Sequence, residues 1–374
     1  MISIGKVRNA DYYLAETHAD DIHEYYGGNE RVGQWAGSFA EQRGLTGSVD
    51  PQVFHNLISG RDADNVSSLT ATATRVPAFD LAVSLDKGSS LVRGLSDADT
   101  RAQFDQALYA ARDDVVAFLE DHGLGVRRGH AGVDHQQASG LMAAVFHHHH
   151  SREGDPQEHL HIVVMNAAEG PDGRVTALDS RKLYTARYTA EAVFQASYRK
   201  HMAEGLGLAF ADVDQHGVAQ IAGIPEPVRD EFSTRRAQIE AVLADRGQRT
   251  AASARVAALA TRKAKGEPLP DEEIRADWRA RAVDLDFEVD DIPRFPRTPK
   301  LDTPNDQLAF AVTERRSTFN QLEAIRQVAI AATDGASYQD VTARAEQFLA
   351  SDEAIEIAPD RWTTQEILNL EQTT

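Results

Sequence analysis

A group of histidines directly before an apolar run constrains this chain more than any other feature. The run His148-His149-His150 is followed by His159-Leu160-His161, and residues 162–165 are then all apolar. Because alternate side chains of a strand point to the same face, His159 and His161 can present two imidazoles to one ion. Residues 141–146 predict a partner strand, and a turn after it would fold His148 back across the pair. We therefore expect a metal site made by His148, His159 and His161.

Three imidazole ligands suit zinc, manganese, cobalt or nickel, and they leave coordination positions open for a substrate oxygen. The alternative is a set of exposed histidines in a turn, or an expression tag. A tag would stand at a terminus rather than between two expected strands. His148 is preferred over His149 and His150 for its spacing to Ser151 and to His159.

The composition limits the chemistry that such a site could support. The 374 residues include no cysteine, so disulfides and thiolate metal sites are excluded, and a nucleophile must be a hydroxyl, a carboxylate or an imidazole. The N-terminus lacks the apolar core of a secretory signal, and no stretch approaches the roughly 18 apolar residues of a membrane span. We expect a soluble, cytoplasmic protein with no membrane insertion.

The net charge of −19 argues against a nucleic-acid partner, but its distribution weakens that argument. Residues 284–374 hold 18 acidic and 8 basic side chains, so more than half of the excess lies in the last quarter. Residues 229–281 run the other way, with 12 basic and 9 acidic side chains. The charge of the whole chain therefore does not decide the partner.

The pattern of apolar residues predicts an α/β region up to about residue 210, followed mostly by helices. Strands are expected at 78–84, around 126–146 and at 159–167, and a hairpin at 208–221. Helices are expected at 9–26, 51–58, 97–121 (capped by Ser96) and 186–204. Four prolines between Asp290 and Pro304 indicate a linker. The predicted division is a domain over 1–292, a linker over 293–304 and a short helical extension over 305–374.

Two tyrosine doublets stand near the N-terminus, Tyr12-Tyr13 and Tyr25-Tyr26. Aromatic pairs on an amphipathic helix usually belong to a core. Adjacent tyrosines point about 100° apart on a helix, so one of each pair can pack while the other faces a cleft. Without cysteine, a tyrosine phenol beside a metal ion is a credible nucleophile toward phosphorus.

Asp80 is a carboxylate inside an otherwise apolar expected strand. It could be a solvated strand-edge residue, or it could accept a ring N–H of a metal-binding histidine, fix the tautomer and take up a proton. Lys87, Arg152 and Lys182 are candidate phosphate contacts, and each could equally be only solvated.

Together these motifs resemble the relaxase domain of MobF-class conjugative relaxases, which are HUH single-strand DNA endonucleases. The resemblance covers residues 1 to about 290. It rests on the two tyrosine doublets, Asp80, and the pattern His148…Ser151-Arg152…Asp155-Pro156…His159-x-His161, with family-like stretches at 34–37, 44–47 and 176–178. Residues 361–368 are similar to the start of the helicase part that follows the relaxase in many of these proteins. No GxxxxGK[ST] loop is present, so ATP-driven unwinding is not expected.

The resemblance implies an α/β palm with a central antiparallel sheet flanked by helices, and a helical C-terminal region like fingers. It implies nicking and rejoining of single-stranded DNA at a plasmid transfer origin. Tyr12 would form a 5′-phosphotyrosine link, Asp80 would orient a histidine and help deprotonate Tyr12, and the second doublet, through Tyr25, would act later. Magnesium or manganese would be the functional ion. Expected partners are the origin DNA, with a hairpin, and accessory relaxosome and coupling proteins, and the protein could enter a recipient cell attached to DNA.

Two departures from the family pattern stand out besides the extra histidines. After Asp80 the sequence reads Ser84-Leu85-Asp86-Lys87-Gly88-Ser89, which adds an acidic residue near the expected DNA path, and the spacing between the doublets exceeds that in relatives. Three other functions stay open. A rolling-circle replication initiator would carry its tyrosines after the histidines, a metallohydrolase would use water instead of Tyr12, and an origin-binding module would not cleave DNA at all.

Overall fold

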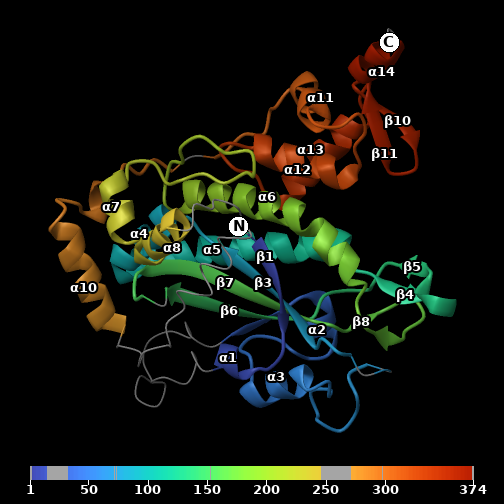
Figure 1. Cartoon of the computed structure of the whole chain (residues 1–374), viewed down its shortest axis with the longest axis horizontal. Coiled ribbons are helices and arrows are strands. Elements are labelled where there is room, and N and C mark those ends of the chain that lie inside the picture. The colour runs from blue at the N-terminus through green and yellow to red at the C-terminus, as the bar shows by residue number, and fades with distance from the viewer. Residues whose placement is uncertain are drawn as a thin grey trace.

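The centre of the molecule is a five-stranded antiparallel sheet (Figure 1). We describe the chain from a computed structural model that covers residues 2–14, 33–70, 72, 74–151, 153–245, 271–296 and 298–372. The strand order across the sheet is β1 (Ile2–Val7), β3 (Ala78–Ser84), β7 (Pro156–Met165), β6 (Ala143–His150) and β2 (Gln34–Ala36). The expected central antiparallel sheet flanked by helices is confirmed.

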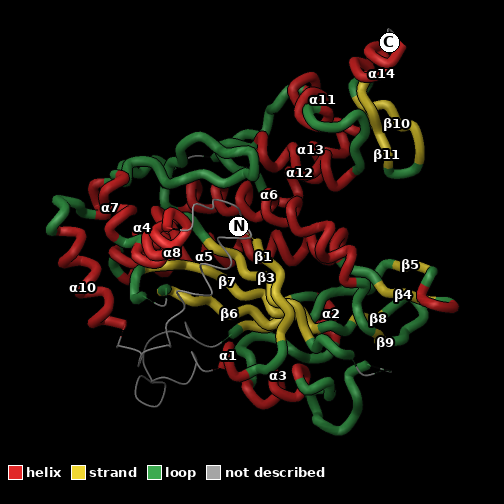
Figure 2. The backbone as a smooth tube through the Cα atoms, viewed as in Figure 1, coloured by secondary structure: helices red, strands yellow, loops and turns green. Residues whose placement is uncertain are grey.

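Helices cover the two faces of this sheet unequally (Figures 1 and 2). One face packs against the two longest helices, α5 (Ala98–Phe118) and α6 (Ser180–Gly205), and Leu81 and Val83 are fully buried there. The other face packs against the short helices α1 (Asp11–Leu14), α2 (Ser38–Gln42) and α3 (Pro51–Ile58) in a separate core that includes Phe54 and Phe146. The sheet therefore separates two apolar cores.

The long helix α5 shows how local sequence sets an element's ends. The side chain of Asp97 accepts the backbone N–H of Thr100 at 2.8 Å, so Asp97 is the N-cap where Ser96 was the expected one. The apolar residues at helical spacing face the core, and Gly123 closes a short π-helical turn, Leu119–Gly123. The helix predicted over 97–121 is thus confirmed, with its cap displaced by one residue.

Several smaller elements decorate this frame. Two short two-stranded ribbons pair β4 (Val126–Arg128) with β5 (Asp134–Gln136), and β8 (Ala168–Glu169) with β9 (Val175–Thr176). The hairpin expected at 208–221 is present in reduced form: its antiparallel arms meet at one isolated bridge, Phe210 to Ile221, with backbone hydrogen bonds from Ala211 to Gln220 and from Ala222 to Ala209, both 2.9 Å, but they form no continuous strands. The side chain of Asp214 accepts the N–H groups of His216 and Val218 at the turn. These two backbone donors therefore do not form hydrogen bonds between strands.

The described residues after 225 are mostly helical, as expected. The α-helices among them are α7 (Glu226–Glu231), α8 (Thr234–Asp245), α10 (Asp271–Val283), α11 (Asn305–Thr313), α12 (Gln321–Ala331), α13 (Tyr338–Leu349) and α14 (Gln365–Gln372). The sequence predicts only helices after residue 305, and this is incomplete: β10 (Ala354–Ala358) and β11 (Arg361–Thr364) form an antiparallel hairpin.

The C-terminal segment, residues 305–372, packs against the helices that cover the sheet. Helices α12 and α13 share one continuous apolar core with α5 and α6. The guanidinium of Arg199, on α6, is fully buried and donates to the carbonyl of Ala332 at 2.9 Å. Figure 1 shows the remaining elements of the segment projecting away from the sheet.

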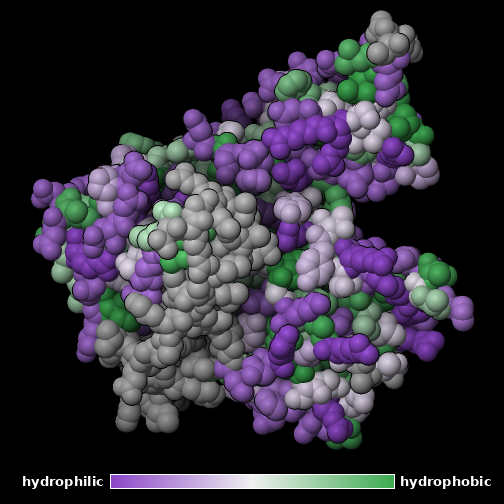
Figure 3. Space-filling view, in the orientation of Figure 1, coloured by the Kyte–Doolittle hydropathy of each residue, from purple (hydrophilic) through white to green (hydrophobic). Residues whose placement is uncertain are grey.

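The visible surface is largely hydrophilic, with apolar residues scattered among polar ones (Figure 3). Among the described helices, none combines the length and the apolar character that crossing a membrane would require.

Candidate metal and nuclease site

The antiparallel pairing of β6 with β7 brings three histidines to one face of the sheet. His148 lies directly opposite His159, and Phe146 lies opposite His161. The imidazole centres are 5.2 Å apart for His148 and His159, 4.8 Å for His148 and His161, and 5.2 Å for His159 and His161. One ligand atom from each lies within 4.8 Å of the others. This near-equilateral arrangement fits three ligands of one divalent ion.

A carboxylate on the neighbouring strand orients one of these rings. Nδ1 of His161 lies 2.9 Å from each carboxylate oxygen of Asp80, on β3. An imidazole N–H that donates to a carboxylate leaves the other ring nitrogen, Nε2, as the ligand atom. Asp80 therefore orients the ring of His161 through this hydrogen bond.

A second ring is oriented by the backbone. Nδ1 of His159 lies 2.9 Å from the carbonyl oxygen of Gln157, which again leaves Nε2 toward the other histidines. Burial, followed by the neighbouring His148 and His161, lowers the pKa of His159 to about 3. The ring is therefore neutral at physiological pH, which is the form that binds metals.

Tyr13 packs into the core beside this group. Its hydroxyl donates to Asp80 Oδ2 at 3.0 Å, and its ring stacks on Phe146 and meets the edge of His161. The ring is only 5% exposed. Tyr13 is therefore the packing member of the first doublet. Tyr12 precedes it in α1, and its side chain lies outside what the structure describes.

Three other predicted residues lie outside the described part of the chain: Tyr25, Tyr26 and Arg152. The two remaining basic candidates are described. Lys87 begins α4 (Lys87–Leu95), and its ammonium donates to the carbonyl of Pro156 at 2.6 Å. Lys182, on α6, donates to Gln137 Oε1 at 2.9 Å. The structure thus brings Lys87 to the start of β7 and Lys182 to the loop before β6.

The acidic residue that departs from the family pattern has a local structural role. Asp86 is the N-cap of α4, and its side chain accepts the backbone N–H of Ser89 at 3.2 Å. A carboxylate at a helix N-terminus also interacts favourably with the helix dipole. Asp86 therefore serves α4, and its presence does not by itself disfavour DNA nearby.

His147 and His149, on either side of His148, point to the opposite face of the sheet, where sequence reasoning missed a partner. Glu158 is fully buried, and its Oε2 lies 2.7 Å from His147 Nε2 and 2.9 Å from His149 Nδ1. Burial raises the pKa of Glu158, but Arg93 and then His149 outweigh it and hold that pKa well below its usual range. The alternation of strand residues was the available signal, since Glu158 and His159 must face opposite ways.

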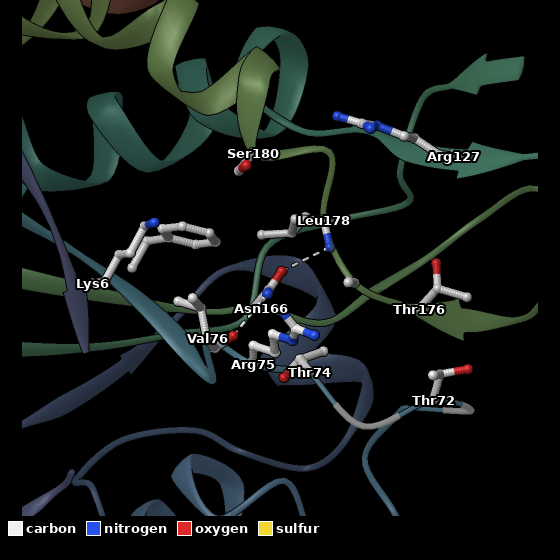
Figure 4. Close-up of a pocket in the computed structure, with 12 residues that line it drawn as sticks. Lys6, Thr72, Thr74, Arg75, Val76, Arg127, Asn166, Thr176, Leu178 and Ser180 are labelled. Carbon is white, nitrogen blue, oxygen red and sulfur yellow. Dashed lines mark hydrogen bonds between the residues drawn. The ribbon is translucent and has the colours of Figure 1, made fainter. Parts of the chain in front are cut away.

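A basic cavity of about 520 Å³ lies at the other end of β3 (Figure 4). Its described lining includes Lys6, Arg75, Arg127 and residues 176–178, with no acidic residue among the described ones, and Arg127 is paired with Asp179 at 2.6 Å. The side chain of Asn166 fixes two walls, because it donates to the carbonyl of Val76 at 2.8 Å and accepts the N–H of Leu178 at 2.9 Å. Such a lining suits an anionic or nucleotide ligand.

Comparison with known proteins gives consistent matches. Residues 7–285 match the family described as TrwC relaxase. The multifunctional conjugation protein TraI of Escherichia coli strain K12 is 31% identical over 305 residues, which cover 77% of this chain and 16% of that protein. The chain thus spans about a sixth of the length of this curated relative.

Two solved structures extend the match to the fold. A conjugative relaxase TrwC in complex with oriT DNA, in a copper-bound form, is similar with a TM-score of 0.67 and 26% identity, covering 77% of this chain and all of that chain. A TrwC complex with a 27-mer DNA that comprises the recognition hairpin and the cleavage site gives a TM-score of 0.65 and 25% identity over the same shares.

Proposed function

The chain belongs to the TrwC relaxase family, and we propose on that premise that it nicks and rejoins one DNA strand at a plasmid transfer origin. The observation that carries the proposal is the group of His148, His159 and His161 with Asp80 and Tyr13 on one face of the sheet. A divalent ion held by the three histidines would polarise a phosphate oxygen and offset the charge that develops in transfer.

In the proposed step the phenol oxygen of Tyr12 forms a bond to phosphorus, and the bond from phosphorus to the 3′ oxygen breaks. The product is a 5′-phosphotyrosine and a strand with a free 3′-hydroxyl, which takes up a proton. Rejoining is the reverse reaction and needs no ATP, because the phosphodiester energy is kept in the tyrosine link. The second doublet, through Tyr25, would act at a later attack, with Tyr26 beside it.

The contacts of Asp80 bear on its two expected roles, which are to orient a histidine and to help deprotonate Tyr12. Both of its oxygens lie at hydrogen-bond distance from His161, and one also accepts the hydroxyl of Tyr13. These contacts favour the orienting role over direct deprotonation of Tyr12. We propose that Asp80 acts through His161 and through the position of α1.

The partner in this proposal is single-stranded origin DNA with a hairpin. One TrwC complex holds oriT DNA, and another holds a 27-mer DNA that comprises the recognition hairpin and the cleavage site. The cavity supports it, because Lys6 and Arg75 line it in a chain of net charge −19, beside Arg127, whose charge is paired with Asp179. Lys87, Arg152 and Lys182 remain proposed phosphate contacts. We also propose accessory relaxosome and coupling proteins as partners, a bacterial cytoplasmic location, and entry into the recipient with the DNA. The functional ion would be magnesium or manganese.

A strand-transfer assay tests the proposal. The protein is incubated with manganese or magnesium, a labelled single strand from the transfer region of its own replicon, and a second, shorter strand that carries the same nick sequence. Transesterification predicts a hybrid strand of new length without ATP, which is lost with EDTA and in Tyr12→Phe. Cleavage that yields only 5′-phosphate ends, with no hybrid, would mean that water attacks and would favour the metallohydrolase alternative.

A further inference from the structure

The histidine run offers more ligands than the three-histidine group uses. Residues 147 to 150 are all histidines on β6, and the side chains of His147 to His149 alternate between the two faces of the sheet. His148 lies on the face of His159 and His161. His147 and His149 therefore point to the opposite face, toward α4 and α5.

On that face the two rings converge on one carboxylate. Glu158, on β7, places Oε2 at 2.7 Å from His147 and 2.9 Å from His149, and the two rings are 4.2 Å apart between centres. One ligand atom from each of the three residues lies within 4.8 Å of the others. With metal–ligand bonds of about 2.1 Å, neighbouring ligand atoms lie about 3.0 Å apart around an octahedral ion and about 3.4 Å apart around a tetrahedral one, so the present hydrogen-bond distances would widen by a few tenths of an ångström when an ion binds.

The surroundings hold the ligands in position. The hydroxyl of Tyr109 lies 3.2 Å from His147 Nδ1, which directs Nε2 of that ring to Glu158. The side chain of His147 is 3% exposed and Glu158 is 0% exposed. His149 is 13% exposed on its side chain, which leaves an approach for an ion.

A nearby cation does not block the site. Arg93 approaches the other oxygen of Glu158 at 3.6 Å, but its Nε and one Nη bind both oxygens of Asp105 at 2.6 and 2.8 Å. With neutral imidazoles, Glu158, Asp105 and Arg93 sum to one negative charge, and Lys87, which also interacts with Glu158, is opposed by Asp155. A divalent ion would therefore meet a favourable field at this face.

We propose that His147, His149 and Glu158 form a second divalent-metal site, separate from the three-histidine group and on the other side of the sheet. Two imidazoles and one carboxylate suit zinc, cobalt, nickel or manganese. The two sites use alternate residues of the same two strands, β6 and β7. The second ion therefore has a structural role, because it links these strands. It fixes β6 to β7 where their register shifts between His148 and His150, and it thereby holds His148 and His159 opposite each other.

Metal stoichiometry of the full chain tests this inference. The metal-free protein is titrated with Zn²⁺ or Co²⁺ by equilibrium dialysis and calorimetry. The wild type should bind two ions per chain. His159→Asn and His149→Asn should each bind one ion, and the double variant none. His130→Asn, an exposed histidine on another element, is the matched control and should still bind two.

Glu158→Gln keeps the side-chain volume and should also bind one ion, and circular dichroism reports whether each variant is folded. A thermal readout is independent of stoichiometry: Zn²⁺ should raise the Tm of His159→Asn and leave that of the double variant unchanged. The proposal is overturned if the folded wild type binds one ion that is lost in His159→Asn, or if His149→Asn still binds two. None of these measurements depends on DNA cleavage, so they stand apart from a failure of the proposed function.

Discussion

Asp80 on β3 and His161 on β7 are joined by their side chains, with both carboxylate oxygens 2.9 Å from the ring nitrogen Nδ1. The two residues are 81 positions apart in the chain, and the antiparallel pairing of their strands brings them together. This contact links the metal-binding histidines of β7 to β3, which lies between β7 and β1 in the sheet.

Replacing Asp80 by asparagine should weaken metal binding. The amide removes the negative charge that favours the Nδ1–H tautomer of His161, so we expect the affinity for Mn²⁺ to fall about 10- to 100-fold. Calorimetric titration of metal-free protein measures this effect. Asp212→Asn changes an exposed carboxylate and should leave the affinity unchanged. An unaltered affinity in Asp80→Asn would show that the contact does not support the site.

Tyr13→Phe should leave the chemistry intact and cost only stability. The ring can still stack on Phe146, and the lost hydroxyl removes one hydrogen bond to Asp80. We expect a loss of about 1 kcal/mol in the free energy of unfolding, measured by urea denaturation. The variant should still form a covalent DNA adduct. Complete loss of the adduct in folded Tyr13→Phe would assign the nucleophile to Tyr13 instead of Tyr12.

Lys87 should give the protein a pH-dependent stability. Burial lowers the pKa of Lys87 from 10.5 to about 8, although Asp155 opposes the shift. Between these two values the unfolded chain holds a proton that the folded chain has lost, so folding becomes more favourable as the pH rises. The wild type should therefore gain stability relative to Lys87→Met from about pH 8 to about pH 10.5. Denaturation of both proteins at several pH values measures the difference, and a constant difference would contradict the burial of the charged amine.

Arg75→Ala should weaken DNA binding without a change in sequence preference. Arg75 is exposed at the rim of the basic cavity, and loss of one phosphate contact should reduce the slope of log affinity against log salt by about 1. Fluorescence anisotropy with an origin strand at several salt concentrations provides the slope. Arg361→Ala, on the distant hairpin of β10 and β11, is the matched control. If the two variants changed the slope equally, the cavity would not be part of the DNA-binding surface.

The core of the candidate site could be predicted because its signals are local. The two-residue period of 159–161 places two histidines on one face, and the turn length to the preceding strand brings back His148. Glu158 was missed because its partners follow from the pairing of β6 with β7, including the register shift after His148. That register depends on packing across the sheet and is not visible in either strand alone.

The fold, too, could be predicted where the signal is local, but not where tertiary contacts decide the structure. In α5 the core residues Phe104, Leu108, Ala111 and Val115 recur at helical spacing, and buried residues alternate along β3. The arms of 208–221 resemble strands, but the side chain of Asp214 captures the backbone donors at the turn. The hairpin of β10 and β11 is short, and Phe319 bonds to Trp362 from outside it, so tertiary contacts decide its state more than its own sequence does.

The most direct test of the central claim is the position of the covalent DNA link. All four candidate tyrosines fall between Arg8 and Arg31, in one tryptic peptide, so cleavage after Glu16 and Glu24 is needed to separate the doublets. Fragmentation mass spectrometry then distinguishes Tyr12 from Tyr13. After incubation with a transfer-origin strand and Mn²⁺, the account predicts a nucleotide remnant on Tyr12, absent with EDTA. A cleaved strand with no modified tyrosine in either peptide would contradict the transesterification mechanism.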